Sequence, residues 1–323
     1  MLDHKLIFYN LHVNTIMIKI LDIGCRYGVF PKFRNSYKSF EYIGVDADEN
    51  EIKRLKKKYH SKKNIKFFSA FLGSKNKKVI FKIYKHKGYS SSHNINKKSL
   101  WFGKIRKNES SILSKKKINC IKSGEWINKN LSGKLILKLD IEGGELDFLK
   151  GLETKNFNNI EAIVAETHFE NPFKSNSNFG SIFSYLSKKG YWLVDMDINY
   201  ENLSVYGIGN SDKIPHAATS IFLKKNYSQI KYENKEIEIK CQTLYVLNLY
   251  AQLIDMIKHY GYSKIKNFKI FNEIKFVCAH RFNFLKNNPH FSHNSLNKDF
   301  KKIFKENLPK HSKFYENSFY NPD

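Results

Sequence analysis

Two aspartates and two glycines near the amino terminus have the spacing of a nucleoside-binding site. Residues 20–28 read ILDIGCRYG, so an apolar strand reaches Asp22 and runs into a turn that contains Gly24 and Gly28. Glycine there lets the backbone approach a ligand closely, and a helix that begins at the turn offers unpaired N–H groups. The next apolar run, YIGVD, ends in Asp46, whose carboxylate can accept hydrogen bonds from a ribose diol. We therefore expect these four residues to bind a nucleoside-containing cofactor.

A second group of carboxylates follows another apolar strand. Residues 135–151 read LILKLDIEGGELDFLKG, which places Asp140 and Glu142 at the carboxyl end of the strand and Glu145 at the start of a helix. Ligands bind at this edge of α/β sheets. Carboxylates so close together repel one another unless a cation or a substrate compensates. We expect Asp140 and Glu142 to be catalytic and Glu145 to contact substrate, although Glu145 could instead stabilise the helix start.

The segment AETHFENPF adds two more polar side chains, Glu166 and His168, after the next predicted strand. Both would lie near Asp140 at the same edge of the sheet. A hydroxyl nucleophile benefits from a general base, and His168 suits that role; the alternative is an ordinary loop histidine. Glu166 is expected to contact substrate. With Asp140 and Glu142 it could also hold a divalent cation through oxygen ligands, but we do not favour a metal.

Charge and composition narrow the function further. The 323-residue chain has a net charge of +26, which suggests nucleic acid as a partner. Nearly all of this charge is lysine, whereas recognition of bases and phosphates favours arginine; the arginines are Arg26, Arg34, Arg54, Arg106 and Arg281. We therefore do not favour nucleic acid. The lysine-rich stretch 85–117 is either solvated surface or a contact for an anionic substrate or membrane surface.

The cellular location of the protein can be predicted from signals that are not found in the sequence. No apolar run approaches the ~20 residues of a membrane helix, and the first residues have no signal-peptide core. The four cysteines are scattered without a CxxC pair, which argues against structural zinc and a disulfide framework. We expect a soluble cytoplasmic protein without a transmembrane segment.

The elements that position these residues alternate between strand and helix. Hydrophobic period and turn residues predict strands at 18–22, 42–46, 65–71, 79–84, 135–140, 162–166, 191–195 and 219–223. They predict helices at 29–39, 49–59, 124–130, 145–151 and 179–189. Such alternation indicates an α/β fold with a doubly wound, mainly parallel sheet. The run 79–84 follows its predecessor too closely for a crossover helix, so it is expected to be antiparallel or a local insertion. Residues 88–117 should be a long loop with some helix.

The pattern changes toward the carboxyl terminus. Residues 243–260 have helical spacing, and residues 288–323 are polar and basic. We expect a cofactor-binding domain over residues 1–225 and a helical, basic extension over residues 226–323.

The motifs together resemble one family. The D-x-G-x-x-x-G turn is similar to that of S-adenosylmethionine-dependent methyltransferases and differs from the dinucleotide G-x-G-x-x-G pattern. The run LKLDIEGGELDFLKG closely resembles the signature of FkbM-type methyltransferases. The run FFSAFLGSKNKKVIFKIYKHKGYSSSH, with the serines at 90–92, resembles their next segment. The resemblance covers about residues 18–225, and Cys25, Arg26 and Tyr27 depart from the smaller residues usual in the turn.

This resemblance implies a class I methyltransferase fold, S-adenosylmethionine as cofactor, and O-methylation of a small-molecule or glycan hydroxyl. It also implies that Ser91 and Ser92 contact substrate. Two alternatives stay open: an RNA methyltransferase, for which no RNA-binding module is recognisable, and a non-enzymatic partner protein with this fold. The intact cofactor turn argues against the second alternative.

Overall fold

The computed structural model describes residues 18–33, 40–102, 106–202, 213–224 and 233–261, together with residues 265, 267, 268, 270 and 271. The chain forms two compact units, one over Ile18–Ile230 and one that combines Met1–Met17 with Lys231–Asp323. The domain boundary expected between residues 225 and 226 lies outside the described residues. No helix in the described ranges is long and apolar enough to cross a membrane.

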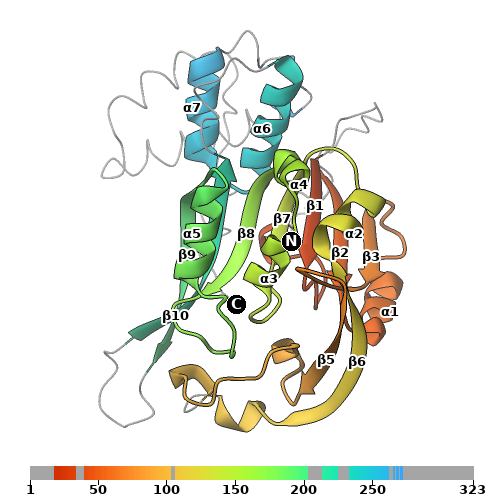
Figure 1. The fold of residues 1–323 in the computed structure, drawn as a ribbon. Coiled ribbons are helices and arrows are strands. Elements are labelled where there is room, and N and C mark those ends of the chain that lie inside the picture. Colours follow the sequence, from red (N-terminus) through yellow and green to blue (C-terminus); the bar gives the residue numbers. More distant parts are fainter. Residues whose placement is uncertain are drawn as a thin grey trace, which may run out of the picture. The chain divides into compact units, whose positions relative to one another are not determined.

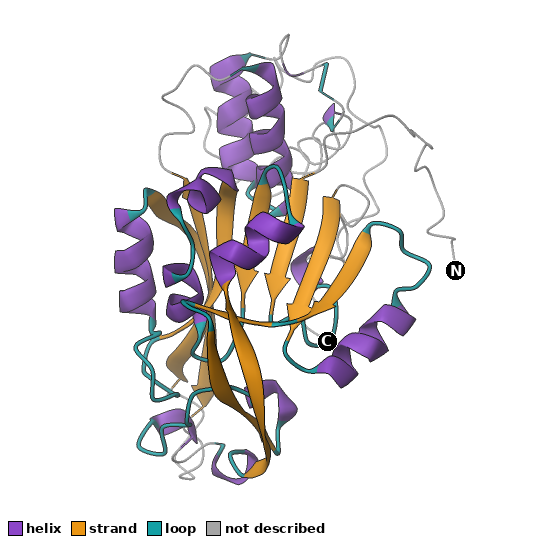
Figure 2. Cartoon of the chain, turned by 45° about the vertical axis from the view of Figure 1, so that its right-hand side comes forward, coloured by secondary structure: helices purple, strands orange, loops and turns teal. Residues whose placement is uncertain are grey.

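A seven-stranded sheet with the order β3-β2-β1-β7-β8-β10-β9 forms the centre of the first unit (Figures 1 and 2). Its strands are β1 (Ile18–Ile23), β2 (Phe40–Asp46), β3 (Ile65–Ser69), β7 (Leu135–Leu139), β8 (Ile160–His168), β9 (Tyr191–Asn202) and β10 (Lys213–Lys224). β1, β2, β3, β7 and β8 pair in parallel, and β10 is antiparallel to both of its neighbours. The expected doubly wound, mainly parallel sheet is confirmed.

Continuous apolar runs explain the central strands, because a parallel sheet is covered on both faces. β7 is buried along its whole length, and β1 and β2 are buried apart from one half-exposed residue each. The described part of this unit has the α-helices α1 (Glu49–Lys58), α2 (Ser123–Asn130), α3 (Glu145–Lys150), α4 (Thr154–Asn159) and α5 (Phe179–Lys188). α1 shows how the sequence specifies them: Asp48 caps its first turn, and Ile52 and Leu55 face the core.

A second sheet is inserted between β3 and α2. It consists of β4 (Phe71–Gly73), β5 (Lys77–Tyr84) and β6 (Ile112–Lys122) in the order β4-β6-β5. β5 is antiparallel to β6, so the run 79–84 is both antiparallel and a local insertion. The prediction of a loop over residues 88–117 is wrong for residues 112–117, because β6 begins at Ile112. Three consecutive lysines concealed the period of this strand. The rest of the stretch includes two short 3-10 turns, Lys87–Tyr89 and Lys107–Glu109.

Other expected elements differ in extent. The predicted helix at 29–39 is not seen in its described part, where residues 31–33 form a single 3-10 turn, and residues 34–39 lie outside the described ranges. α4 was not predicted. In the second unit, the helical stretch expected at 243–260 is two helices, α6 (Asn234–Val246) and α7 (Tyr250–Tyr260). They are separated near Asn248, whose φ is +59°. The predicted polar tail at 288–323 lies outside the described residues.

Candidate active site

A cavity lies at the carboxyl ends of β1, β2, β7 and β8, and residues of the inserted sheet form another of its walls. From the central sheet it is lined by Gly24, Asp46, Asp140, Glu142 and Glu166, among others. From the insertion it is lined by Phe81, His86, Tyr89, Ser92 and His93, among others. Residues predicted from separate motifs to be functional therefore meet in one cavity, and part of the stretch 88–117 lines it as well.

Gly24 lets the end of β1 lie directly against the residue that follows β7. Its φ is +85°, and a Cβ at this position would overlap the carbonyl oxygen of Asp140. The N–H of Gly24 donates to the carbonyl of Val45 at 2.8 Å, and the N–H of Asp140 donates to the carbonyl of Ile23 at 3.0 Å. A glycine is therefore required both for the backbone conformation and for the close approach. Gly24 also lines the cavity, so it is placed to let a ligand approach the turn.

Gly28 has a different environment. Its φ is +96°, and a Cβ there would lie 2.7 to 3.1 Å from atoms of the Tyr59 side chain. The Tyr59 hydroxyl accepts a hydrogen bond from the N–H of Val29 at 3.4 Å. Gly28 is not among the residues that line the cavity. A glycine at this position makes room for Tyr59, and the cofactor contact expected of Gly28 stays a prediction.

Asp46 ends β2 and lines the cavity. Its Oδ1 accepts a hydrogen bond from the N–H of Asp48 at 2.8 Å, and the Arg26 guanidinium lies 3.8 Å from the same oxygen. Burial raises the pKa of Asp46 to about 6, although the nearby Arg26 charge opposes the rise. Arg26 also pairs with Asp48 at 3.1 Å. Arg26, an unusual residue in this turn, thus fixes the loop that holds Asp46.

Asp22 contacts two buried side chains, Tyr42 and Lys138. The Tyr42 hydroxyl donates to its Oδ2 at 2.6 Å, and the Lys138 ammonium lies 3.1 Å from its Oδ1. Asp22 is buried and is not among the cavity-lining residues. Lys138 also reaches Oδ2 of Asp140 at 3.3 Å. Asp22 is therefore placed to hold Lys138, and the cofactor contact expected from its position in the motif stays a prediction.

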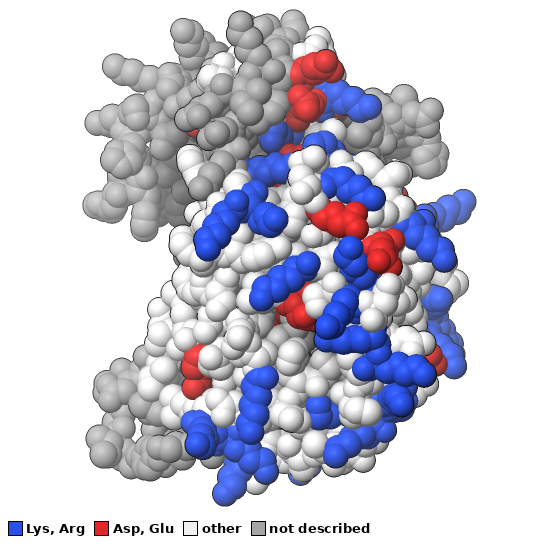
Figure 3. All heavy atoms as spheres, in the orientation of Figure 1, with Lys and Arg blue, Asp and Glu red and all other residues white. Residues whose placement is uncertain are grey.

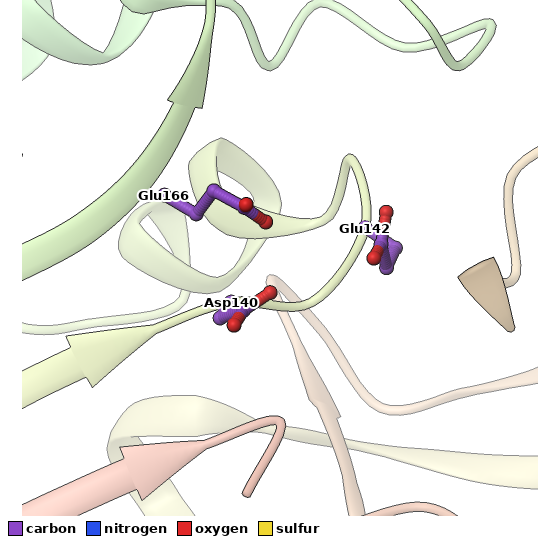
Figure 4. Close-up of side chains that lie close together, drawn as sticks. All are labelled: Asp140, Glu142 and Glu166. Atoms are coloured by element: carbon purple, nitrogen blue, oxygen red, sulfur yellow. The ribbon is translucent and has the colours of Figure 1, made fainter. Parts of the chain in front are cut away.

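Asp140, Glu142 and Glu166 form a carboxylate cluster (Figure 4). Asp140 directly follows β7, Glu142 lies in the next turn with a φ of +54°, and Glu166 projects from β8. One oxygen from each lies within 4.8 Å of the others. The carboxylates face a common space, as Figure 4 shows. The predicted convergence of these residues at one edge of the sheet is therefore seen in the structure.

The charges within the carboxylate cluster are unequal. Burial opposes ionisation of Asp140, but the Lys138 ammonium and a hydrogen bond from Glu166 together lower the pKa of Asp140 below its usual range. Burial and the Asp140 charge raise the pKa of Glu142 well above its usual range. The Asp140 charge and burial do the same for the pKa of Glu166. The cluster thus combines one ionised carboxylate with two that retain protons more readily. Three carboxylate oxygens are also a donor set that a hard divalent cation accepts.

Glu145 is fully buried and engaged by the protein. Its Oε1 accepts the N–H of Ile141 at 2.9 Å, and its Oε2 accepts the hydroxyl of Ser177 at 2.8 Å. It is not part of the cavity lining. These contacts hold the turn between β7 and α3, a role that differs from the helix-start interaction considered above, and the substrate contact expected of Glu145 stays a prediction.

The two predicted serines also differ. The Ser91 hydroxyl donates to the carbonyl of Glu142 at 2.7 Å and accepts the N–H of His93 at 3.0 Å. Ser91 is buried and does not line the cavity, so it links the insertion to the turn that carries Glu142. Ser92 lines the cavity and remains available for the predicted substrate contact.

His168 lies two residues beyond Glu166 on β8, so both side chains are on the same face of the sheet. It is buried, it does not line the cavity, and its Nδ1 has no hydrogen-bond partner among the residues that the structure describes. Burial and the nearby His216 lower its pKa to about 4. His168 is therefore neutral at physiological pH and a weak base. Its position does not give direct access to an acceptor in this cavity.

Two important residues were not predicted. Lys138 is a charged residue in the middle of the apolar strand LILKL, and a buried charge needs a partner; that was the signal in the sequence. Tyr89 lines the cavity from the insertion, but no sequence pattern separates it from the other aromatic residues of the chain.

The fold and this site define a class I, S-adenosylmethionine-dependent methyltransferase. Residues 22–193 match the methyltransferase FkbM domain, and the chain belongs to that family. The family resemblance and the cofactor expected from the sequence are thereby confirmed.

Similar solved structures share little sequence with the chain. One is magnesium protoporphyrin IX methyltransferase from Synechocystis PCC 6803 with bound S-adenosylmethionine, with 9% identity and a TM-score of 0.35, covering 65% of this chain and 71% of that one. Another is TrmK from M. capricolum with S-adenosylhomocysteine, with 12% identity and a TM-score of 0.34, covering 81% and 90%. A putative RNA methyltransferase from Pyrococcus horikoshii has 9% identity and a TM-score of 0.32, covering 64% and 74%. No curated protein sequence matches the chain.

Proposed function

We propose that this methyltransferase is an O-methyltransferase that acts on a hydroxyl of a sugar, a glycan or a related small molecule. The observation that carries the proposal is the carboxylate cluster, which lines the same cavity as Asp46. Asp46 thus offers a carboxylate that can accept hydrogen bonds from a ribose diol. The carboxylate cluster offers several hydrogen-bonding groups to the hydroxylated molecule that receives the methyl group.

The cofactor side of the cavity is made by Asp46 and Gly24. Asp46 would accept hydrogen bonds from the ribose hydroxyls, and Gly24 keeps the turn free of a side chain where the cofactor must pass. S-adenosylmethionine supplies an electrophilic methyl group when it is bound. The residues around Asp46 fit this cofactor because an acceptor carboxylate at the end of the second strand faces the cavity while Arg26 fixes its loop.

The acceptor side is made by the carboxylate cluster. Asp140 is ionised and is held by Lys138, so its carboxylate can accept a hydrogen bond from the hydroxyl that is to be methylated and orient it. Glu142 and Glu166, whose pKa values are raised, can donate hydrogen bonds to neighbouring oxygens while they hold their protons. A polyol offers several hydroxyls to such a set. Alignment of the hydroxyl with the methyl carbon is the main requirement of the displacement.

The direct test is methyl transfer to a panel of sugars, glycans and small hydroxylated molecules, with an RNA pool as a separate arm. Release of S-adenosylhomocysteine reports turnover, and mass spectrometry locates the new methyl group on oxygen, nitrogen or carbon. We expect O-methylation in the carbohydrate or small-molecule arm. Methylation of RNA alone would overturn the proposal in favour of an RNA methyltransferase.

Asp140→Asn tests the site within that assay. The substitution preserves size and removes charge, so we expect cofactor affinity and melting temperature near those of the wild type, and turnover lower by about 10²-fold or more. Asp197→Asn, on an exposed part of β9, is the matched control and should retain full turnover. Full activity of Asp140→Asn would exclude the acceptor site assigned here.

A further inference from the structure

The inserted sheet presents an exposed ribbon, defined here as β5 and residues 112–119 of β6. Every residue from 112 to 117 is exposed. Leu113 is 62% exposed and Ile112 is 43% exposed, and Ile80 on β5 is 45% exposed. These aliphatic side chains lie on a part of the protein that is not needed to complete the central sheet.

One edge of the ribbon has no neighbouring strand within the described residues. β4 pairs with β6 only at residues 120–122, so the part of β6 from 112 to 119 is paired on the β5 side alone. Lysines commonly protect such an edge, and Lys115, Lys116 and Lys117 do so here. Protection does not explain Ile112 and Leu113, because exposed aliphatic residues on an open edge favour association.

The ribbon is also uniformly basic. Its sequences KKVIFKIY and ILSKKKIN contain no acidic residue. Lys117 lies opposite Ile80 across the two strands, and Lys115 lies opposite Lys82. Figure 3 shows Lys and Arg side chains gathered at the lower right of this face, where Figure 1 places β5 and β6. Exposed aliphatic residues flanked by lysines are the combination that binds the interface of an anionic bilayer.

We propose that the ribbon docks on an anionic lipid surface. The open edge of β6 faces the lipid, so side chains from both faces of the strand reach it. Ile112 and Leu113 enter the interface, and Lys115, Lys116 and Lys117 contact the lipid phosphates. The aliphatic character of the exposed residues favours lipid over RNA, because single-stranded RNA is bound by stacking on aromatic side chains and by arginine. The exposed large apolar side chains of the ribbon are Ile80, Ile112 and Leu113, and the ribbon has no arginine.

Docking would bring the cavity to the lipid surface. Phe81 of β5 lines the cavity, as do His86, Tyr89 and Ser92 in the segment that follows β5. If the proposed O-methylation is correct, and this step rests on it, the acceptor hydroxyl belongs to a molecule carried on that surface. Lipid binding itself requires neither cofactor nor acceptor, so the two proposals can fail separately.

The test is co-sedimentation of the full chain with vesicles of phosphatidylcholine, with or without phosphatidylglycerol, and no cofactor or acceptor present. We expect binding only when phosphatidylglycerol is present, and weaker binding at high salt. A triple Lys115→Gln, Lys116→Gln, Lys117→Gln variant should bind about tenfold more weakly or worse. Ile112→Ser with Leu113→Ser should also bind more weakly while retaining its salt dependence.

The matched control removes three exposed lysines from α1 instead: Lys53→Gln, Lys56→Gln and Lys57→Gln. It changes net charge equally and should bind vesicles like the wild type. An equal loss in this control would show unspecific attraction and overturn the proposal. Full binding by the Ile112 and Leu113 variant would overturn it as well, as would ribbon-dependent binding to single-stranded RNA without vesicle binding. Melting temperatures near that of the wild type confirm that the variants are folded.

Discussion

Nζ of Lys138 lies 3.1 Å from Oδ1 of Asp22, and both side chains are buried beneath the cavity. The same ammonium reaches Asp140 at 3.3 Å. Asp22 therefore influences the site through Lys138, because it helps to hold the positive charge that keeps Asp140 ionised. The structure thus gives Asp22 a buried ion pair with Lys138, in addition to the cofactor contact that the motif predicts for it.

Lys138→Met is expected to destabilise the protein strongly. Removing one partner of a buried ion pair leaves Asp22 buried without its counter-charge, which costs about 3–5 kcal/mol of the free energy of unfolding. Urea unfolding measures this loss. The double variant with Asp22→Asn should recover much of it, because an amide can still accept the Tyr42 hydroxyl. If the double variant were no more stable than Lys138→Met, the coupling would be refuted.

A comparison of Gly24→Ala with Gly133→Ala separates the free-energy cost of backbone strain from the cost of the close approach to Asp140. Gly24 and Gly133 have nearly equal φ values, +85° and +82°, but a Cβ at Gly133 would meet no atom within 4 Å. Gly133→Ala should therefore lose only the strain, about 1–2 kcal/mol. Gly24→Ala should lose about 1–3 kcal/mol more from overpacking and should bind cofactor less tightly. Similar melting temperatures for the two variants would contradict the contact.

Cofactor affinity should depend on Asp46 and on pH. Asp46→Ala is expected to weaken S-adenosylmethionine binding by about 1.5–3 kcal/mol, the range for hydrogen bonds to a charged group. The pKa of Asp46 is raised to about 6, so the carboxylate is ionised above that pH and protonated below it. Affinity should accordingly fall as the pH drops through about 6. Calorimetry across this range measures the effect, and Asp46→Asn should abolish the step; a step that persists would assign it to another group.

Turnover is expected to persist in the presence of a chelator. Lys138 already supplies a fixed positive charge at Asp140, and raised pKa values let Glu142 and Glu166 keep protons that relieve the repulsion. The carboxylate cluster can therefore exist without a cation. Assays with EDTA, followed by added Mg²⁺, check this. Loss of activity that Mg²⁺ restores would instead make the carboxylate cluster a metal site.

The sequence was sufficient to predict the positions of residues that follow from strand direction. Asp46, Asp140 and Glu166 were placed at one edge because the carboxyl ends of parallel strands meet there. The sequence could not tell whether an acidic side chain at this edge faces the cavity or the protein. Asp22 and Glu145 face buried partners, Lys138 and Ser177 respectively, and those partners come from distant segments. Only the fold brings them together.

His168→Ala should distinguish a catalytic base from a supporting residue. Its pKa of about 4, lowered by burial and by His216, leaves it neutral through the physiological range, and it does not line the cavity. We therefore expect turnover to fall less than about tenfold, below the range for loss of a general base, with an unchanged pH profile above about pH 5. Truncating a buried ring should still lower the free energy of unfolding by about 1–3 kcal/mol. The comparison is with Asp140→Asn, assayed with the same acceptor across the same pH range. A loss in His168→Ala as large as in Asp140→Asn, together with a shifted pH profile, would make His168 the base and leave Asp140 to position the acceptor.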